Sequence, residues 1–384
     1  MTVADVGERA ASHEPGSGHG TDSAADPANP EGSTGPAGRA TSGKAHAAEP
    51  VASSNGRRFL GLLAAIAILA LIVLASVAVG SRYIPPNALL EALANNTGEG
   101  NAHIVWDLRI PRTAVGFCIG LSLGVAGALI QALTRNPLAD PGILGVNAGA
   151  SFFVALGVAA FGVTSISGQV AFAFVGALVV TVTVYLIGSA GTGATDPVKL
   201  TLSGVALGAV LGGIVTAMIL IDPRAFNKMR SWNAGSIADR SWDILLPVLP
   251  FLAIGLLLAI FASGSLNVIA LGDDLARSLG TDVMRTRVIV VVAVTLLAGG
   301  ATAIAGPIGF VGLMIPHIAR WIVGPDQRWI LAYTMVLAPS LVLAADILAR
   351  VLRWPGEFPV GIVTAFIGAP VLIILVRRQK ASGL

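Results

Sequence analysis

The ionisable residues of this sequence avoid the centres of its long apolar runs. Proton- and sodium-coupled carriers commonly place Asp, Glu or His there, so this distribution argues against an ion-coupled secondary transporter. No run carries a His-Glu-x-x-His metal helix or a nucleophile beside a base, which argues against an intramembrane enzyme. Cys118 is the single cysteine and can form neither an internal disulfide nor a cysteine-based metal site. We therefore expect no catalytic residue, no bound metal and no cofactor in this chain.

Nucleotide chemistry also has to come from elsewhere. The sequence has no Gly-x-x-x-x-Gly-Lys-Ser/Thr loop to hold ATP phosphates, so ATP-driven work would need a partner that binds and hydrolyses ATP with Mg²⁺. A short charged helix between two glycines offers a landing place for such a partner, although a solvated loop remains the alternative. Its candidate residues are Gly272, Asp273, Asp274, Ala276, Arg277, Leu279 and Gly280.

The elements that must position these residues are membrane-spanning helices. The chain has 384 residues, of which 54% are hydrophobic and only 12% charged, whereas soluble domains carry roughly 25% charged residues. A helix needs ~20 apolar residues to cross about 30 Å of hydrocarbon. Runs without Asp, Glu, Lys or Arg cover residues 59–81, 113–134, 141–195, 200–221, 244–272, 288–319, 329–345 and 358–376.

Two of these runs are too long for one span. We expect the run 141–195 to hold two helices joined near Thr164 to Gly168. The run 288–319 contains prolines, and we expect one full helix followed by a short, broken one that continues towards Val323. The sequence thus predicts an all-α membrane protein with about ten transmembrane helices in a compact bundle.

Charge predicts the orientation of this bundle. Arginines precede the first span, and Arg377, Arg378 and Lys380 follow the last, so the positive-inside rule places both termini in the cytoplasm and requires an even number of crossings. The excess of positive charge indicates topology and contact with lipid headgroups rather than nucleic-acid binding. Residues 1–55 are polar, rich in Gly, Ala, Ser and Pro, and predict a disordered cytoplasmic tail ahead of a membrane domain at 56–384.

Glycine and proline interrupt the apolar pattern in two similar segments, residues 136–145 and 306–316. Such paired interruptions often mark the repeats and the central pathway of transporters. Glycines spaced by four residues, as at Gly116, Gly120 and Gly124 and again at Gly204, Gly208 and Gly212, favour close helix packing. The candidates for lining or gating a pathway are Asn136, Pro137, Leu138, Pro141, Gly142, Pro307 and Pro316.

Several motifs together resemble a known family. They are Leu108-Arg-Ile-Pro-Arg112, the stretch from Gln131 to Ser151 that contains Asn-Pro-Leu-Ala-Asp-Pro-Gly, Leu271-Gly-Asp-Asp-Leu-Ala-Arg-Ser-Leu-Gly280, Gly309-Phe-Val-Gly-Leu-Met-Ile-Pro-His-Ile-Ala-Arg320 and Pro359-Val-Gly-Ile-Val-Thr-Ala365. In this order they resemble the permeases of iron-siderophore and vitamin B12 ABC importers. The resemblance covers about residues 57–380, and the long second motif is most similar to permeases for ferric enterobactin-type siderophores.

The resemblance implies a machine of several subunits in a bacterial cytoplasmic membrane. This chain would pair with a second, similar or identical permease, two cytoplasmic ATPase subunits and an extracytoplasmic siderophore-binding protein. By the same resemblance, Arg109, Arg112 and Arg350 would receive acidic side chains of the binding protein, and the segment 272–280 would fit a groove on the ATPase. Headgroup anchoring is the alternative for the arginines, and cobalamin or haem is the alternative for the substrate.

Overall fold

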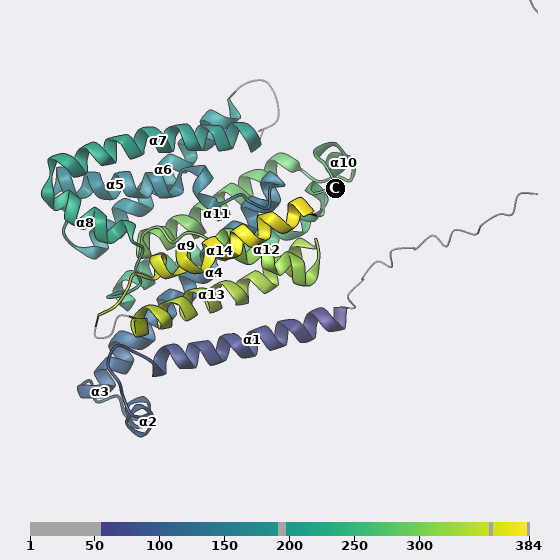
Figure 1. Ribbon diagram of the computed structural model, residues 1–384. Helices are drawn as coiled ribbons and strands as arrows, with labels where there is room; N and C mark the ends of the chain where they lie inside the picture. The colour runs from purple at the N-terminus through teal and green to yellow at the C-terminus, as the bar shows by residue number, and fades with distance from the viewer. Residues whose placement is uncertain (1–54, 191–196, 353–355, 382–384) are drawn as a thin grey trace, which may run out of the picture. The chain divides into compact units, whose positions relative to one another are not determined.

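A computed structural model describes residues 55–190, 197–352 and 356–381, and helices make up most of this part (Figure 1). The expected tail at 1–55 lies outside it, apart from its last residue. The elements are α1 (Asn55–Ala78), α2 (Pro86–Ala94), α3 (Gly100–His103), the π-helix η1 (Ile104–Arg109), α4 (Ile110–Thr134), the 3₁₀ turn η2 (Pro141–Leu144), α5 (Val146–Phe161), α6 (Ile166–Ser189), α7 (Pro197–Ile221), α8 (Pro223–Asn233), α9 (Trp242–Ile269), α10 (Asp273–Ser278), α11 (Val283–Ala305), α12 (Val311–Val323), α13 (Gln327–Leu352) and α14 (Val360–Ala381).

Seven of the described helical segments are long and apolar enough to cross a membrane. They are α1, the continuous stretch from α3 to α4, α6, α7, α9, α11 and α13. Three shorter apolar helices accompany them, at Val146–Phe161, Val311–Val323 and Val360–Ile374. The structure thus confirms an all-helical membrane architecture.

Both expected interruptions are present. The run 141–195 divides between α5, which ends at Phe161, and α6, which begins at Ile166 with the Ser165 hydroxyl accepting a hydrogen bond from Gly168 N. The run 288–319 divides between α11 and α12, where Gly306 has a φ of 75°. Pro307 lies in that break, whereas Pro316 lies inside α12 without ending it.

Helix α4 is central because its glycines let neighbouring backbones approach closely. A methyl group on Gly120 would lie 2.6 Å from Pro339 Cα of α13, and one on Gly127 would overlap the Gly312 carbonyl of α12. Gly116 and Gly124 also face side chains of α13. The predicted glycine packing of this span is therefore confirmed, and the bundle core is held by close van der Waals contact.

The glycines of α7 behave differently along its length. Gly204 packs against the Ile143 carbonyl of η2, and Gly208 has only Ala148 near it. No atom of the described residues lies within 4 Å of a methyl group placed on Gly212. Close packing on α7 is therefore confined to the end that contacts η2.

The functional candidates lie at two opposite ends of the helices, which Figure 1 separates clearly. We call one the arginine end; it contains the last turn of α1, the helices α2, α3 and α8, the start of α4 and the end of α13. The other is the α10 end, which contains α10 and the first turns of α11 and α13. Each end carries a separate polar network.

Candidate functional site

At the arginine end, Arg109 closes the last turn of α1. Its Nη1 donates hydrogen bonds to the carbonyl oxygens of Val77 at 3.0 Å and Ala78 at 2.7 Å, and its Nη2 donates to the Arg82 carbonyl. The last carbonyl groups of a helix have no partner within the helix, so this side chain satisfies them. Only 5% of Arg109 is exposed, so this side chain is buried between the helices.

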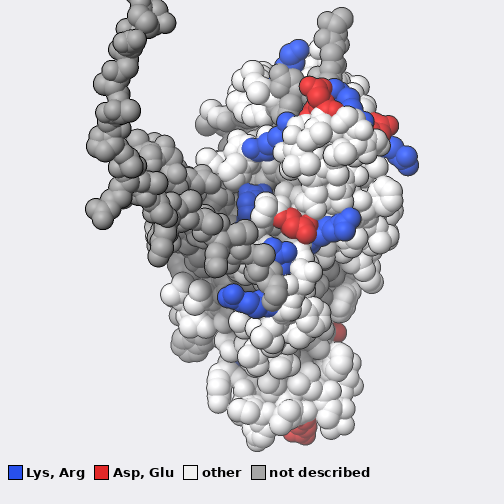
Figure 2. All heavy atoms as spheres, turned by 90° about the vertical axis from the view of Figure 1, so that its right-hand side faces the viewer, with Lys and Arg blue, Asp and Glu red and all other residues white. Residues whose placement is uncertain are grey.

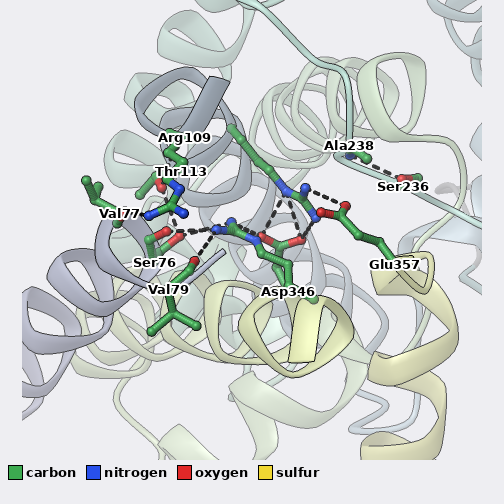
Figure 3. A network of polar contacts seen from close by, with 11 residues as sticks. Ser76, Val77, Val79, Arg109, Thr113, Ser236, Ala238, Asp346 and Glu357 are labelled. Carbon is green, nitrogen blue, oxygen red and sulfur yellow. Dashed lines mark hydrogen bonds and ion pairs between the residues drawn. The ribbon is translucent and has the colours of Figure 1, made fainter. Parts of the chain in front are cut away.

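Arg350, from the last turn of α13, reaches the same helix end. Its Nη1 donates to the carbonyl oxygens of Ser76 at 2.8 Å and Val79 at 2.9 Å, and its Nη2 donates to the Ser76 hydroxyl and the Asp346 carboxylate. It is 2% exposed. The two arginines thus reach the end of α1 from different helices. Figure 3 shows Arg109 beside Val77 at this end. Together the two arginines fix α1 against α4 and α13.

Arg112 has a different environment, formed by two carboxylates. Its Nη2 and Nε donate to Asp346 at 2.6 Å and 3.2 Å, and its Nη1 donates to Glu357 Oε2 at 2.6 Å. Asp346 therefore bridges two arginines and is itself 1% exposed. Glu357 is the outer member of the chain, with 25% of its side chain exposed. Charge-assisted pairs of this kind are short and directional.

Arg109, Arg112, Arg350 and Glu357 line a cavity of about 810 Å³, which we call the vestibule. Arg240, another lining residue, donates from Nε to the Ile304 carbonyl at 2.6 Å. Burial lowers the pKa of Arg240, and the carboxylate of Asp239 opposes that shift. The ionisable lining residues are Arg82, Arg109, Arg112, Arg240 and Arg350 against Asp107, Asp239 and Glu357, so positive charge prevails in the vestibule.

At the α10 end, Asp273 anchors the segment expected to contact an ATPase. Its carboxylate pairs with Arg135, from the loop after α4, and with Arg287 of α11 at 2.6 Å. Ala276, within α10, is buried and packs with Ile269 and Val283. Gly272 and Gly280 bound it with φ angles of 117° and 79°, which L side chains rarely adopt. The segment is thus held by the ion pairs of Asp273 at its start and by buried Ala276 in its middle.

The outward face of α10 is mixed in character. Asp274 and Arg277 form an exposed pair at 3.1 Å, and Leu275 and Leu279 are 48% and 61% exposed. Figure 2 views the molecule from this side and shows acidic and basic side chains close together there. Sequence reasoning named most of these residues but not Leu275, or Arg135 as the support of Asp273. The available signal for Leu275 in the sequence was a second leucine, four residues before Leu279, in the same short charged segment.

The pathway candidates belong to two segments of the chain, which meet only in part. Asn136 Oδ1 accepts a hydrogen bond from Leu138 N at 2.9 Å, and Asp140 Oδ1 accepts one from Gly142 N at 2.8 Å, so side chains replace helical hydrogen bonds in this turn. Pro137 lies within the same turn, at the residue before Leu138.

The second broken segment meets the first at the start of α12. A methyl group on Gly312 would lie 3.3 Å from Pro141 Cδ. Pro316 is buried within α12, and Pro307 lies apart from it, beside an apolar cavity of about 520 Å³ that Gly361 and Phe366 also line. The structure therefore brings Pro141 to the α12 break but does not gather all the candidates at one site.

These features define a class of protein, a multi-span helical membrane protein with a polar network at each end. The described residues contain no group of three or more His, Cys, Asp or Glu side chains that could hold a metal ion. The sequence profile of the FecCD transport family matches residues 68–378. The chain belongs to this family and is a translocation subunit of the cytoplasmic membrane rather than an enzyme.

Individual relatives agree with this assignment. The chain is 50% identical over 308 residues to the ferric enterobactin transport system permease protein FepD of Escherichia coli (strain K12), covering 80% of this chain and 92% of that protein. It is 38% identical over 321 residues to the probable siderophore transport system permease protein YfiZ of Bacillus subtilis (strain 168), covering 84% and 96%. A solved structure of a metal-chelate type ABC transporter in an inward-facing conformation aligns with a TM-score of 0.73 at 27% identity, covering 83% of this chain and 99% of that one.

Proposed function

We propose that this chain is the permease subunit of an ATP-binding-cassette importer that moves a ferric siderophore across the cytoplasmic membrane. The observation that carries the substrate class is the 50% identity to a ferric enterobactin permease over most of both chains. The chain performs no covalent chemistry in this scheme. It pairs with a second permease subunit, and the chelate passes along their shared interface.

In this proposal the chain crosses the membrane ten times, with both termini in the cytoplasm. The seven long and three shorter apolar helices supply enough segments for that count. The α10 end then faces the cytoplasm, and the arginine end faces outward. The positive-inside rule disfavours arginines on the outer side of the membrane. Here Arg109 and Arg350 bind carbonyl groups at the end of α1, and Arg112 binds carboxylates, so these arginines have structural roles at that end.

The two ends then serve two partners. A substrate-binding protein docks through acidic side chains over the arginine end, where the vestibule carries an excess of arginines. Two cytoplasmic ATPase subunits bind and hydrolyse ATP with Mg²⁺, and one of them contacts α10 of this chain. The exposed leucines and the charged pair of α10 suit a groove on such a partner, in the manner of a helix laid into a groove.

Uptake in cells tests this function. A strain that lacks its own ferric enterobactin permease is given this chain with its partner subunits, and accumulation of iron-55 as ferric enterobactin is measured. We expect uptake that disappears when the ATPase subunit is left out. Uptake of cobalamin or haem, with no uptake of any ferric siderophore supplied, would instead assign the chain to another substrate of the same machinery.

A further inference from the structure

The two edges of the Arg112 guanidinium lie in different surroundings. The edge formed by Nε and Nη2 contacts Asp346, whose side chain is 1% exposed. The remaining nitrogen, Nη1, donates to Glu357, whose side chain is 25% exposed and lines the vestibule. The inner carboxylate is thus buried within the protein, whereas the outer one is partly exposed. Figure 3 shows both carboxylates.

The backbone around Glu357 is anchored, and its side chain is held through one group. Phe358 N donates to the Ala349 carbonyl at 3.2 Å, and Gly361 N donates to the Gly235 carbonyl at 2.9 Å. Within the described part of the chain, Arg112 is the one hydrogen-bonding partner of the Glu357 carboxylate. A change of rotamer at Glu357 would therefore release Arg112 Nη1 without moving α13 or α14.

Arg109 and Arg350 do not offer an equivalent site. Both guanidinium groups bind carbonyl oxygens at the end of α1, and both are at most 5% exposed. Recruiting either one to a partner would leave buried carbonyl groups without a hydrogen bond, which is unfavourable. Among these three arginines, Arg112 alone has an edge that is both exposed to the vestibule and paired with a replaceable group.

We propose that Glu357 holds, in the free permease, the place that a carboxylate of the substrate-binding protein takes on docking. Docking is then an exchange of one carboxylate for another on Arg112 Nη1, and Glu357 acts as a built-in competitor that weakens the resting complex. This inference rests on the proposed function, because it requires an acidic docking partner.

The exchange has a physical rationale in both states. The Arg112 side chain is 13% exposed, and the exchange keeps a carboxylate on both of its edges before and after docking. The intramolecular Glu357 competes at a high effective concentration, so the partner must displace it at each docking event. The excess of arginines in the vestibule still attracts an acidic surface over a distance of several ångströms.

The test measures the affinity of the purified substrate-binding protein of this transporter for the complete complex in lipid nanodiscs. Glu357→Gln and Glu357→Ala remove the competitor. Asp239→Asn is the matched control, because it removes one negative charge from the same vestibule without touching Arg112. Its backbone has a φ of 56°, a conformation that asparagine tolerates.

Both Glu357 variants are expected to bind the substrate-binding protein roughly three- to tenfold more tightly. In the unmodified chain the Arg112–Glu357 ion pair keeps part of the molecules from docking, and the variants lack this pair. The gain persists at about 0.5 M salt, where general charge effects are largely screened. Any gain from Asp239→Asn fades at that salt concentration. Glu357→Asp, which keeps the charge on a shorter side chain, gives a smaller gain and replaces the glutamine variant if that one fails to assemble.

Unchanged or weaker binding by the Glu357 variants, with Arg112→Gln still weakening the complex, would overturn the exchange but leave docking at the arginine end intact. An equal gain in the Asp239 and Glu357 variants at both salt concentrations would also overturn it, because a general charge effect would then suffice. If Arg112→Gln binds as tightly as the unmodified complex, the proposed docking site fails as well.

Discussion

The substitution Asp346→Asn would remove the charge that Arg112 and Arg350 share. Asp346 contacts Nη2 and Nε of Arg112 and Nη2 of Arg350, and it is 1% exposed. Asparagine has nearly the same shape but one oxygen fewer and no charge, so packing changes little. The variant therefore removes the charge and places an amide donor where a carboxylate oxygen accepts hydrogen bonds from a guanidinium group.

The expected loss follows from burial. Removing one member of a buried ion pair typically costs 3–5 kcal/mol, because the other charge is left without compensation. In Asp346→Asn two guanidinium groups are affected, although Arg112 keeps Glu357 and Arg350 keeps its bonds to the end of α1. We therefore expect a destabilisation of about 3–5 kcal/mol, near the single-pair range and not twice it.

The assay is denaturant unfolding of the purified chain in mixed micelles, followed by tryptophan fluorescence. Glu357→Gln is the matched control, since it neutralises the partly exposed carboxylate of the same network and should cost about 1 kcal/mol or less. A loss of less than about 1 kcal/mol for Asp346→Asn would refute the view that this network holds α1, α4 and α13 together.

Three further predictions concern other parts of the chain. Gly120→Ala should lower the stability of the purified chain by about 1–3 kcal/mol, because its methyl group meets Pro339, whereas Gly213→Ala, which meets nothing within 4 Å, should not; equal stability of the two variants would contradict the packing of α4. Leu275→Asp should leave the isolated chain folded but reduce transport-coupled ATP hydrolysis in the complex, and an equally strong effect of Leu90→Asp on exposed α2 would argue against a specific contact. The rigorously purified chain should turn over no ATP, as measured by phosphate release, since it lacks a phosphate-binding loop; steady turnover would refute the division of labour between subunits.

Sequence patterns located the membrane helices well because hydrophobic length is a strong constraint in a bilayer. They also placed the break before α12, where Pro307 and the positive φ of Gly306 interrupt the helix. They did not reveal that the helix of the second span starts at Gly100, because η1 contains charged residues that lie outside an apolar run.

The roles of the arginines were harder to predict. Sequence indicated that Arg109, Arg112 and Arg350 matter, but it could not show that two of them bind carbonyl groups at the end of α1. Those contacts join residues about 30 and 270 positions apart, and backbone carbonyls have no signature in a sequence. Asp346 and Glu357 went unnoticed for the same reason, since their partner Arg112 is more than 230 residues away.

Reconstitution in proteoliposomes tests the central claim most directly. The chain is purified with its second permease and ATPase subunits, inserted into vesicles and supplied with the substrate-binding protein and iron-55 ferric enterobactin on the side of the arginine end. The account predicts accumulation that requires ATP and the ATPase subunit and persists when proton and sodium gradients are abolished. Accumulation by this chain without the ATPase, driven by an ion gradient, would contradict it.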